Sequence, residues 1–201
     1  MIDDTAASRK QALREQARKA RIAQPNKEAV SAEVCRAIVA MPEYAAAKTV
    51  LWYVDAGSEV KTRHALPEAL TQGKTIVVPY CIVETNQLEL FHLEAMEELV
   101  EGAYKILEPD VALRDKPGKR IEPELLDFVL VPGTAFSPDG ARMGQGKGYY
   151  DRLLNRVRRD APLVGVAFDG QIFDDIPMDV HDVFMDYIAT PTRLLKGKGR
   201  G

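Results

Sequence analysis

Short apolar runs rich in β-branched residues recur along the chain, and each has the length of one buried strand. They occupy residues 49–54, 75–79, 128–132, 163–168 and 185–190. Apolar positions at helical spacing, together with helix start and stop residues, predict helices up to about residue 23 and over 26–41, 62–72 and 149–158. Residues 87–93 instead alternate polar and apolar side chains, which is typical of an antiparallel or edge strand.

The order of these elements predicts an α/β fold. The strand at 49–54, the helix at 62–72 and the strand at 75–79 follow one another within about 30 residues, the spacing of a right-handed βαβ unit. Such a unit places its two strands parallel in one sheet. Ligands of parallel sheets gather outside the carboxyl ends of the strands, where residues 55–59 and 79–81 would lie.

The segment 131–152 connects a predicted strand to a predicted helix and carries the most distinctive chemistry of the chain. After Gly133, which marks the end of the strand, it holds four glycines and two interleaved cations: Gly140, Gly144, Gly146, Gly148, Arg142 and Lys147. Glycines let backbone N–H groups approach an anion closely, and a helix N-terminus adds partial positive charge. The two cations favour a phosphate. The P-loop pattern and the strict dinucleotide-binding spacing are both absent, and a glycine-rich turn without a ligand is the alternative.

Charged residues at both ends of the chain suit the same ligand. Four cations share one face of the first predicted helix: Lys10, Arg14, Arg18 and Arg21. This face favours an anionic partner, although a solvated basic face is the alternative. Asp151 and Asp182 are candidate ligands for Mg²⁺, which keeps several waters and takes one or two protein oxygens beside phosphates. We expect most other aspartates near the C-terminus to serve as caps, turns and surface residues.

Composition indicates the number of domains, the partners and the compartment to expect. The chain has 201 residues, 46% of them hydrophobic and 28% charged, and a net charge of -3, which fits one domain and gives no argument for a nucleic-acid partner. Cys35 and Cys81 lack metal-ligand spacing, so we expect free thiols in a reducing compartment. No signal peptide or membrane span is recognisable, which predicts a cytoplasmic protein without a membrane partner.

Two further polar stretches are considered for their conformation and role. The basic residues of segment 113–123 predict either a mobile lid over phosphates or a solvated connection. The tail 194–201 is basic and glycine-rich, so we expect it to be flexible.

The glycine segment resembles a known family. Its core reads Gly144-Gln145-Gly146-Lys147-Gly148-Tyr149-Tyr150-Asp151-Arg152, preceded by Pro132-Gly133, Phe136, Gly140 and Arg142. This pattern is similar to the signature of the 5-formyltetrahydrofolate cyclo-ligases, also called 5,10-methenyltetrahydrofolate synthetases. The pair Lys10 and Arg14, the step from Glu59 to Thr62, and Glu108-Pro109 extend the resemblance over nearly the whole chain. It implies one three-layer, Rossmann-like α/β domain with an open, mainly parallel sheet and helices on both faces.

The resemblance implies an enzyme with ATP and Mg²⁺ as cofactors. The formyl oxygen on N5 of 5-formyltetrahydrofolate attacks the γ-phosphate, which gives an imidoyl phosphate and ADP. N10 then attacks the activated carbon, and phosphate leaves. Catalysis becomes mostly positioning and charge stabilisation, because phosphorylation turns a poor leaving oxygen into a good one. The alternatives are a non-catalytic folate- or nucleotide-binding regulator on the same fold, and hydrolysis of another phosphate ester.

The resemblance also assigns site residues. ATP would be bound by Lys10, Arg14, Arg142, Gly144, Gln145, Gly146, Lys147, Gly148, Tyr149, Tyr150 and Asp151. Catalysis would involve Arg142, Lys147 and Tyr150, and Mg²⁺ would be held by Asp151 and Asp182. Glu59 would accept from the pterin N–H groups, and the folate site would comprise Val54, Glu59, Pro79, Tyr104, Lys147 and Tyr150. Lys119 and Arg120 resemble a phosphate-contacting loop, the role of Lys61 stays open, and we expect a monomer.

Overall fold

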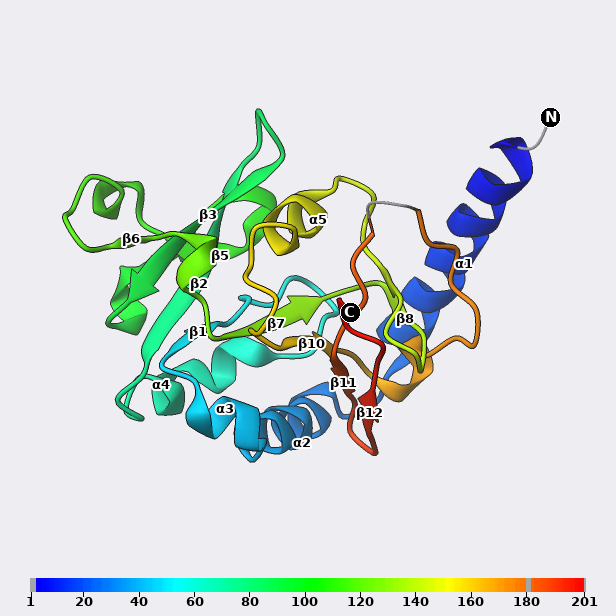
Figure 1. Cartoon of the computed structure of the whole chain (residues 1–201), viewed down its shortest axis with the longest axis horizontal. Helices are drawn as coiled ribbons and strands as arrows, with labels where there is room; N and C mark the ends of the chain where they lie inside the picture. Colours follow the sequence, from blue (N-terminus) through cyan, green and yellow to red (C-terminus); the bar gives the residue numbers. More distant parts are fainter. Residues whose placement is uncertain (1–2, 180–181, 201) are drawn as a thin grey trace.

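A mainly parallel β-sheet runs through the centre of the molecule (Figure 1). The computed structural model describes residues 3–179 and 182–200, and within them eight strands form this sheet. Its parallel strands lie in the order β11 (Tyr187–Ala189), β10 (Leu163–Val166), β7 (Phe128–Pro132), β1 (Thr49–Leu51) and β2 (Thr75–Ile82). Antiparallel strands flank them, with β12 (Leu194–Lys196) beside β11, and β3 (Gln87–Leu93) followed by β6 (Arg120–Ile121) beside β2.

Helices cover both faces of the sheet, because its central strands are apolar on both sides. One layer holds α2 (Lys27–Val39), α3 (Pro42–Ala46) and α4 (Leu66–Ala69), and the opposite layer holds α5 (Tyr149–Leu154) (Figure 1). Successive strand residues face opposite layers. Val50 and Val78 lie in the core that includes α2, whereas Leu51 and Val77 lie in the core that includes α5. The predicted α/β fold with helices on both faces is confirmed.

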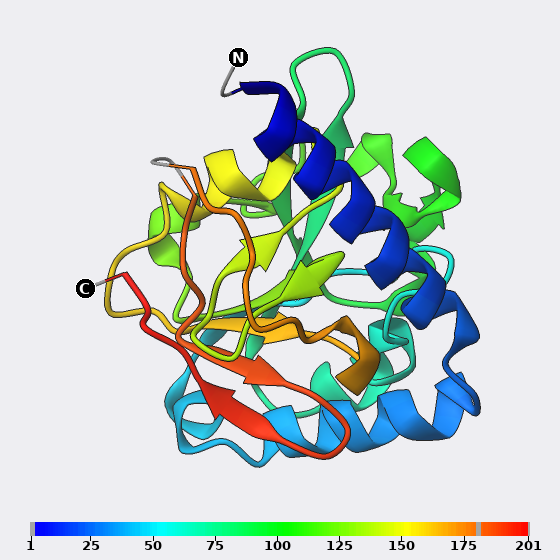
Figure 2. The ribbon, with the colours of Figure 1, turned by 90° about the vertical axis from the view of Figure 1, so that its right-hand side faces the viewer.

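The long helix α1 (Asp3–Ala23) runs diagonally across the molecule in front of the sheet (Figure 2). It packs on a two-stranded ribbon formed by β8 (Ala135–Phe136) and β9 (Arg142–Met143), with Ala17 fully buried against it. Small residues allow a second close contact, because a Cβ on Gly170 would lie 3.3 Å from the Cβ of Ala20. This packing places the cationic face of α1 beside the glycine segment.

Several predicted elements are shorter in the structure. The helix expected at 62–72 forms as the 3₁₀ turn η1 (Thr62–His64) followed by α4, where Pro67 is tolerated because the first helical N–H groups have no partner within the helix. The helix expected at 149–158 ends at Leu154. The remaining short elements are η2 (Met96–Glu98), β4 (Leu99–Glu101), η3 (Ala103–Lys105), β5 (Leu107–Pro109), η4 (Val111–Leu113), η5 (Pro123–Leu125) and η6 (Asp169–Gln171).

The flexible tail predicted for residues 194–201 is wrong for the part that the structure describes. Residues 194–196 form β12, which pairs with β11. Gly197 donates its N–H to the Asp186 carbonyl over 2.8 Å, and the Arg200 guanidinium donates to the Val157 carbonyl over 2.8 Å. A Cβ on Gly197 would overlap the Met185 carbonyl, so this glycine serves close backbone packing. Gly201 lies outside the described residues.

The segment 113–123 joins the sheet where β6 pairs with β3, while residues 115–118 before it are exposed, as expected of a solvated connection. The Lys119 ammonium lies 2.6 Å from the Glu94 carboxylate and 2.5 Å from that of Glu98. Arg120 lies 3.2 Å from the Glu89 carboxylate. Both cations are therefore paired at this edge of the sheet.

The strand order creates a topological switch point at β1. The chain passes from β1 to β2 on one side, whereas β7 lies on the other side of β1. Open α/β sheets bind ligands in the crevice outside the carboxyl ends of the strands at such a point. The sheet itself therefore directs attention to the segments that follow β1 and β7.

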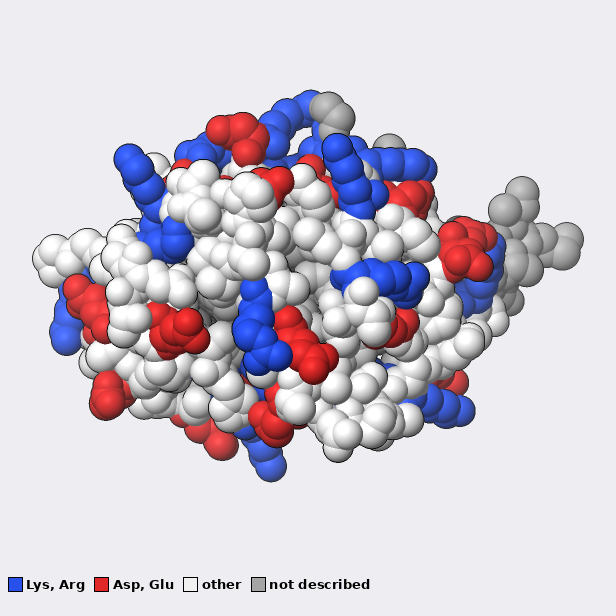
Figure 3. Space-filling view, turned by 90° about the horizontal axis from the view of Figure 1, so that it is seen from below, with Lys and Arg blue, Asp and Glu red and all other residues white. Residues whose placement is uncertain are grey.

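Surface charge and the hydropathy of the helices say little about the position of a site. Seen from below, cationic and anionic side chains are interspersed on a mostly uncharged surface (Figure 3). Within residues 3–179 and 182–200, none of the helices combines the length and the hydropathy needed to cross a bilayer.

Candidate active site

The glycine loop at 144–148 follows β9 and leads into α5. Gly146 and Gly148 have φ angles of 91° and 73°, a left-handed backbone that residues with a Cβ rarely adopt. Arg14 of α1 donates from Nε to the Gly144 carbonyl over 3.2 Å. The structure thus brings Arg14 and the glycine loop together, as the sequence predicts.

Arg142 is the first residue of β9, and its side chain reaches the carboxyl end of β7, where it is almost fully buried with 4% exposed. Its Nη1 donates to the Pro132 carbonyl over 3.2 Å, and its Nη2 forms an ion pair with Asp151. Its guanidinium carbon is 5.9 Å from the centre of the Tyr150 ring. The predicted phosphate ligand and the predicted metal ligand therefore contact each other in this structure.

Tyr150 carries a hydroxyl that is buried and has no hydrogen-bond partner among the described residues. Burial raises the pKa of this phenol well above its usual range, and the nearby Glu59 carboxylate raises it further. A neutral hydroxyl without a partner costs about 1–3 kcal/mol in a buried place. A bound ligand with an acceptor atom would remove this cost.

Glu59 lies in the loop that follows β1 and is buried. Its Oε2 accepts from the Ala56 N–H over 3.0 Å, and its Oε1 lies 3.5 Å from the guanidinium of Arg21 on α1. Burial raises the pKa of the Glu59 carboxyl, while the Ala56 N–H and Arg21 oppose that rise. A carboxylate in this position can accept from N–H donors of a ligand.

The structure assigns a role to Lys61, which the sequence left open. Its ammonium lies 3.2 Å from the Asp55 carboxylate and 2.6 Å from the Gly57 carbonyl. The Asp55 side chain is 1% exposed and also accepts from the Arg63 N–H over 3.0 Å. These contacts close the loop that presents Glu59. Asp55 has no distinctive sequence signal beyond its position after a buried strand.

The hairpin of β4 and β5 reaches from β2 to the glycine loop. At its tip, the Tyr104 hydroxyl accepts from the Lys147 ammonium over 2.7 Å and lies 3.3 Å from the Tyr149 hydroxyl. The hydrogen bond from Lys147 lowers the pKa of Tyr104. Tyr104 and Lys105 have φ angles of 56° and 59°, which are uncommon for residues other than glycine.

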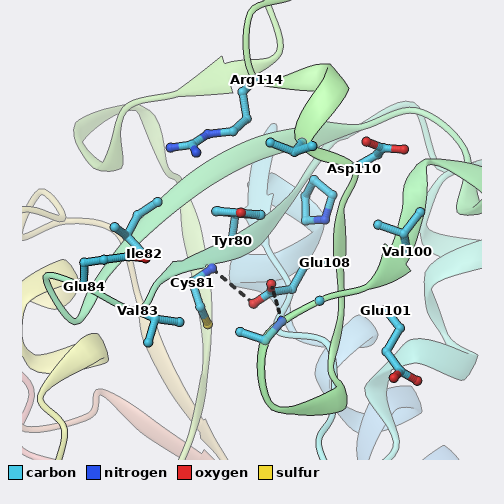
Figure 4. Close-up of a pocket in the computed structure, with 14 residues that line it drawn as sticks. Tyr80, Cys81, Ile82, Val83, Glu84, Val100, Glu101, Glu108, Asp110 and Arg114 are labelled. Atoms are coloured by element: carbon cyan, nitrogen blue, oxygen red, sulfur yellow. Dashed lines mark hydrogen bonds between the residues drawn. The ribbon is translucent and has the colours of Figure 1, made fainter.

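Glu108 holds this hairpin in place. Its side chain is buried, and its two carboxylate oxygens accept from the Cys81 N–H over 3.1 Å and from the Ala103 N–H over 3.0 Å (Figure 4). It therefore joins the end of β2 to the tip that carries Tyr104. A cavity of about 430 Å³ opens beside this junction. Its walls include Tyr80, Val100 and Arg114 (Figure 4).

The comparisons with known proteins bear on this arrangement. A profile of the 5-formyltetrahydrofolate cyclo-ligase family matches residues 6–191. The chain belongs to this family. A probable 5-formyltetrahydrofolate cyclo-ligase of Schizosaccharomyces pombe is 30% identical over 179 residues, covering 83% of this chain and 86% of that protein. The cyclo-ligase of Mycolicibacterium smegmatis is 31% identical over 152 residues, with 73% and 75% covered.

Solved structures extend the similarity to the fold of the cyclo-ligase family. The NMR structure of Aquifex aeolicus 5,10-methenyltetrahydrofolate synthetase superposes with a TM-score of 0.80 at 34% identity and covers 96% of this chain and 95% of its own. A synthetase from Mycoplasma pneumoniae gives a TM-score of 0.70 at 26% identity, with 90% and 97% covered. The family resemblance read from the glycine segment is therefore confirmed.

Not every predicted site residue of this cyclo-ligase contacts the glycine loop. The Lys10 ammonium lies 2.6 Å from the Asp179 carboxylate, and the Asp182 carboxylate accepts from the Asp179 N–H over 2.6 Å. In residues 3–179 and 182–200, no group of three or more His, Cys, Asp or Glu side chains is arranged to hold a metal. Val54 follows β1, and Pro79 lies on the part of β2 beyond its pairing with β1.

Proposed function

We propose that this chain converts 5-formyltetrahydrofolate to 5,10-methenyltetrahydrofolate with hydrolysis of ATP to ADP and phosphate. The observation that carries the proposal is the position of Tyr150. Its ring lies against Arg142 of the glycine segment and packs against the core that contains Val54 and Val60, from the segment that carries Glu59. The segment with a buried acid for a pterin and the cationic glycine loop for a phosphate therefore both border Tyr150.

The roles of the residues follow from this arrangement. Arg14, Arg142 and Lys147 supply positive charge to the phosphates, while the bare backbone of the glycine loop allows close approach. Glu59 accepts from the pterin, and the walls of the folate site come from Val54, Pro79 and Tyr104. The unpartnered Tyr150 hydroxyl donates to an oxygen of the substrate. Lys10 and the loop residues Gln145 and Tyr149 complete the nucleotide site.

The reaction then needs no nucleophilic side chain. The formyl oxygen attacks the γ-phosphorus and ADP departs, which leaves an imidoyl phosphate on N5. N10 attacks the activated carbon, and the carbon–oxygen bond breaks with loss of phosphate. Holding the two substrates in line accounts for most of the acceleration in such a displacement.

The acidic residues fit Mg²⁺ bound mainly through the nucleotide. Asp151 lies in the first turn of α5, next to the glycine loop, with 36% of its side chain exposed. Mg²⁺ beside phosphates takes one or two protein carboxylates and keeps its waters, so a dedicated three-residue cage is not required. Asp151 would hold the ion, with Asp182 as a second candidate. When bound, Mg²⁺ would neutralise charge on the transferring phosphate.

A coupled assay tests the proposed function. ADP release and the near-ultraviolet absorbance of the methenyl product are followed with both substrates and with each alone. We expect ADP to form only with 5-formyltetrahydrofolate and in step with the absorbance. Folate binding without any turnover would instead identify a non-catalytic regulator, and ADP release without folate would identify a phosphohydrolase. The cytoplasmic location and the monomeric state stay predictions, and size-exclusion chromatography tests the second.

A further inference from the structure

The cationic face of α1 serves two different parts of the site. Arg14 contacts the glycine loop, while Arg21 lies seven residues further along α1, about 10 Å at 1.5 Å per residue. The Arg21 side chain is 9% exposed, and its Nε donates to the Ser58 hydroxyl over 3.0 Å. Its Nη1 lies 3.5 Å from Glu59 Oε1. A buried guanidinium therefore contacts the carboxylate that is proposed to recognise the pterin.

We propose that Arg21 is a positioning residue for folate recognition, which it supports by holding the Glu59 carboxylate in place and in its charged form. This inference rests on the proposed function. Arg21 contacts one oxygen of Glu59 and the Ala56 N–H contacts the other, so the carboxylate is held from both sides. A carboxylate has about four lone-pair positions, which leaves two for donors of the ligand.

Electrostatics explains why the partner has to be a cation. Glu59 has lost nearly all contact with water, and desolvation favours the protonated, neutral acid. A protonated carboxyl group would present a donor where the pterin N–H groups need acceptors. Arg21 opposes this protonation, because a paired charge tolerates burial far better than an isolated one. The charged and titratable groups that influence Glu59 or feel its charge are Arg21, Lys61, Asp55, Tyr53 and Tyr150.

Substitution of Arg21 by Met tests the inference, because Met keeps an apolar stem of similar length and removes the charge. Arg18→Met is the matched control, since Arg18 lies one turn earlier on the same cationic face and is exposed. Calorimetry measures the affinity for 5-formyltetrahydrofolate between about pH 5.5 and 8.5, and steady-state kinetics measures KM for each substrate. Arg21→Lys keeps the charge without the planar fork.

We expect Arg21→Met to weaken folate binding at neutral pH by roughly 30-fold or more. As the pH is lowered, its folate affinity should begin to fall at a higher pH than that of the wild type, because Glu59 protonates more readily without the Arg21 charge. KM for ATP should change less than about twofold, Arg18→Met should behave as the wild type, and Arg21→Lys should be intermediate with a nearly normal pH profile.

Three results would overturn the inference. Arg21→Met could bind folate with the affinity and pH profile of the wild type, both substrates could lose affinity equally, or Arg18→Met could show the same loss. Circular dichroism checks folding, and if Arg21→Met does not fold, the folate affinity of Arg21→Lys decides, because an affinity equal to that of the wild type would overturn the inference. A wild-type protein that does not bind folate at all would refute the proposed function itself, whereas failure of Arg21→Met alone refutes only the role of Arg21.

Discussion

Replacing Glu108 by Ala should destabilise the protein strongly, although the residue lies away from the glycine loop. Its carboxylate accepts two backbone N–H groups, those of Cys81 and Ala103, and its side chain is buried. Hydrogen bonds to a charged group contribute about 1.5–3 kcal/mol each, and both donors would lose their acceptor. We therefore expect a loss of about 3–5 kcal/mol, a large part of the 5–15 kcal/mol that typically stabilises a domain.

Urea unfolding measures this loss, with the fluorescence of Trp52, the one tryptophan of the chain, as the signal. Trp52 is fully buried in the core, so its emission reports global unfolding. Glu108→Gln keeps one carbonyl acceptor and should lose about half as much. Glu101→Ala is the control, because Glu101 lines the same cavity and is exposed. A loss below about 1 kcal/mol for Glu108→Ala would refute the inference that this carboxylate stabilises the junction between β2 and the hairpin tip.

A double-mutant cycle sharpens the test. A Cβ on Gly102 would overlap Glu108 Oε2, so Gly102→Ala alone should also destabilise the protein. In the Glu108→Ala background this overlap no longer exists, and the added cost of Gly102→Ala should shrink markedly. Strictly additive effects would show that the two residues act independently.

The remaining predictions concern the site, the thiols and the tail. Asp151→Asn and Arg142→Ala should each abolish most turnover in the coupled assay, while calorimetry should show folate binding largely retained; retained turnover would remove these residues from the phosphate site. Cys35 and Cys81 should react slowly with a disulfide reagent until urea is added, because burial raises the pKa of Cys35 to about 12 and also raises that of Cys81; rapid labelling of the folded protein would contradict this. Deletion of residues 194–201 should lower the midpoint of thermal unfolding by roughly 5–10 °C, since it removes β12 and the contacts of Arg200. An unchanged midpoint would instead support the sequence-based prediction that this tail is flexible.

Local sequence signals were sufficient for the five parallel strands, for β3 and for the glycine loop, but not for β6 and β12. Buried strands read as apolar runs, and left-handed turns such as those at Gly146 and Gly148 require glycine wherever the chain folds. Helical spacing likewise placed the cations on one face of α1, because that periodicity depends only on local geometry, and Arg14 of this face contacts the glycine loop. Element ends were less accurate, since α5 ends at Leu154 and α4 at Ala69, before the ends predicted at 158 and 72.

Contacts between distant segments were beyond the sequence. Glu108 is singled out in it only by the resemblance at Glu108-Pro109, and nothing local shows that it accepts two N–H groups. Lys119 lies in a basic segment that resembles a phosphate-contacting loop, yet two glutamates pair with it. The glycines of the tail suggested mobility, whereas Gly197 is needed for close packing against Met185. In each case the partner comes from a different element, so its identity depends on the fold.

The ion pairs of the candidate site bear on how a chain with a net charge of -3 would bind the anionic nucleotide of the proposed function. Arg142 is paired with Asp151 and Lys10 with Asp179, so each of these two cations has an anionic partner within the protein. Under the proposed function, a phosphate would replace Asp151 as the partner of Arg142, and the Asp151 carboxylate would then be available to hold Mg²⁺ beside that phosphate. Arg142 is buried and cannot gain much from solvent, so exchanging one anionic partner for another avoids leaving it unpaired. Nucleotide and metal would therefore bind together more readily than either alone.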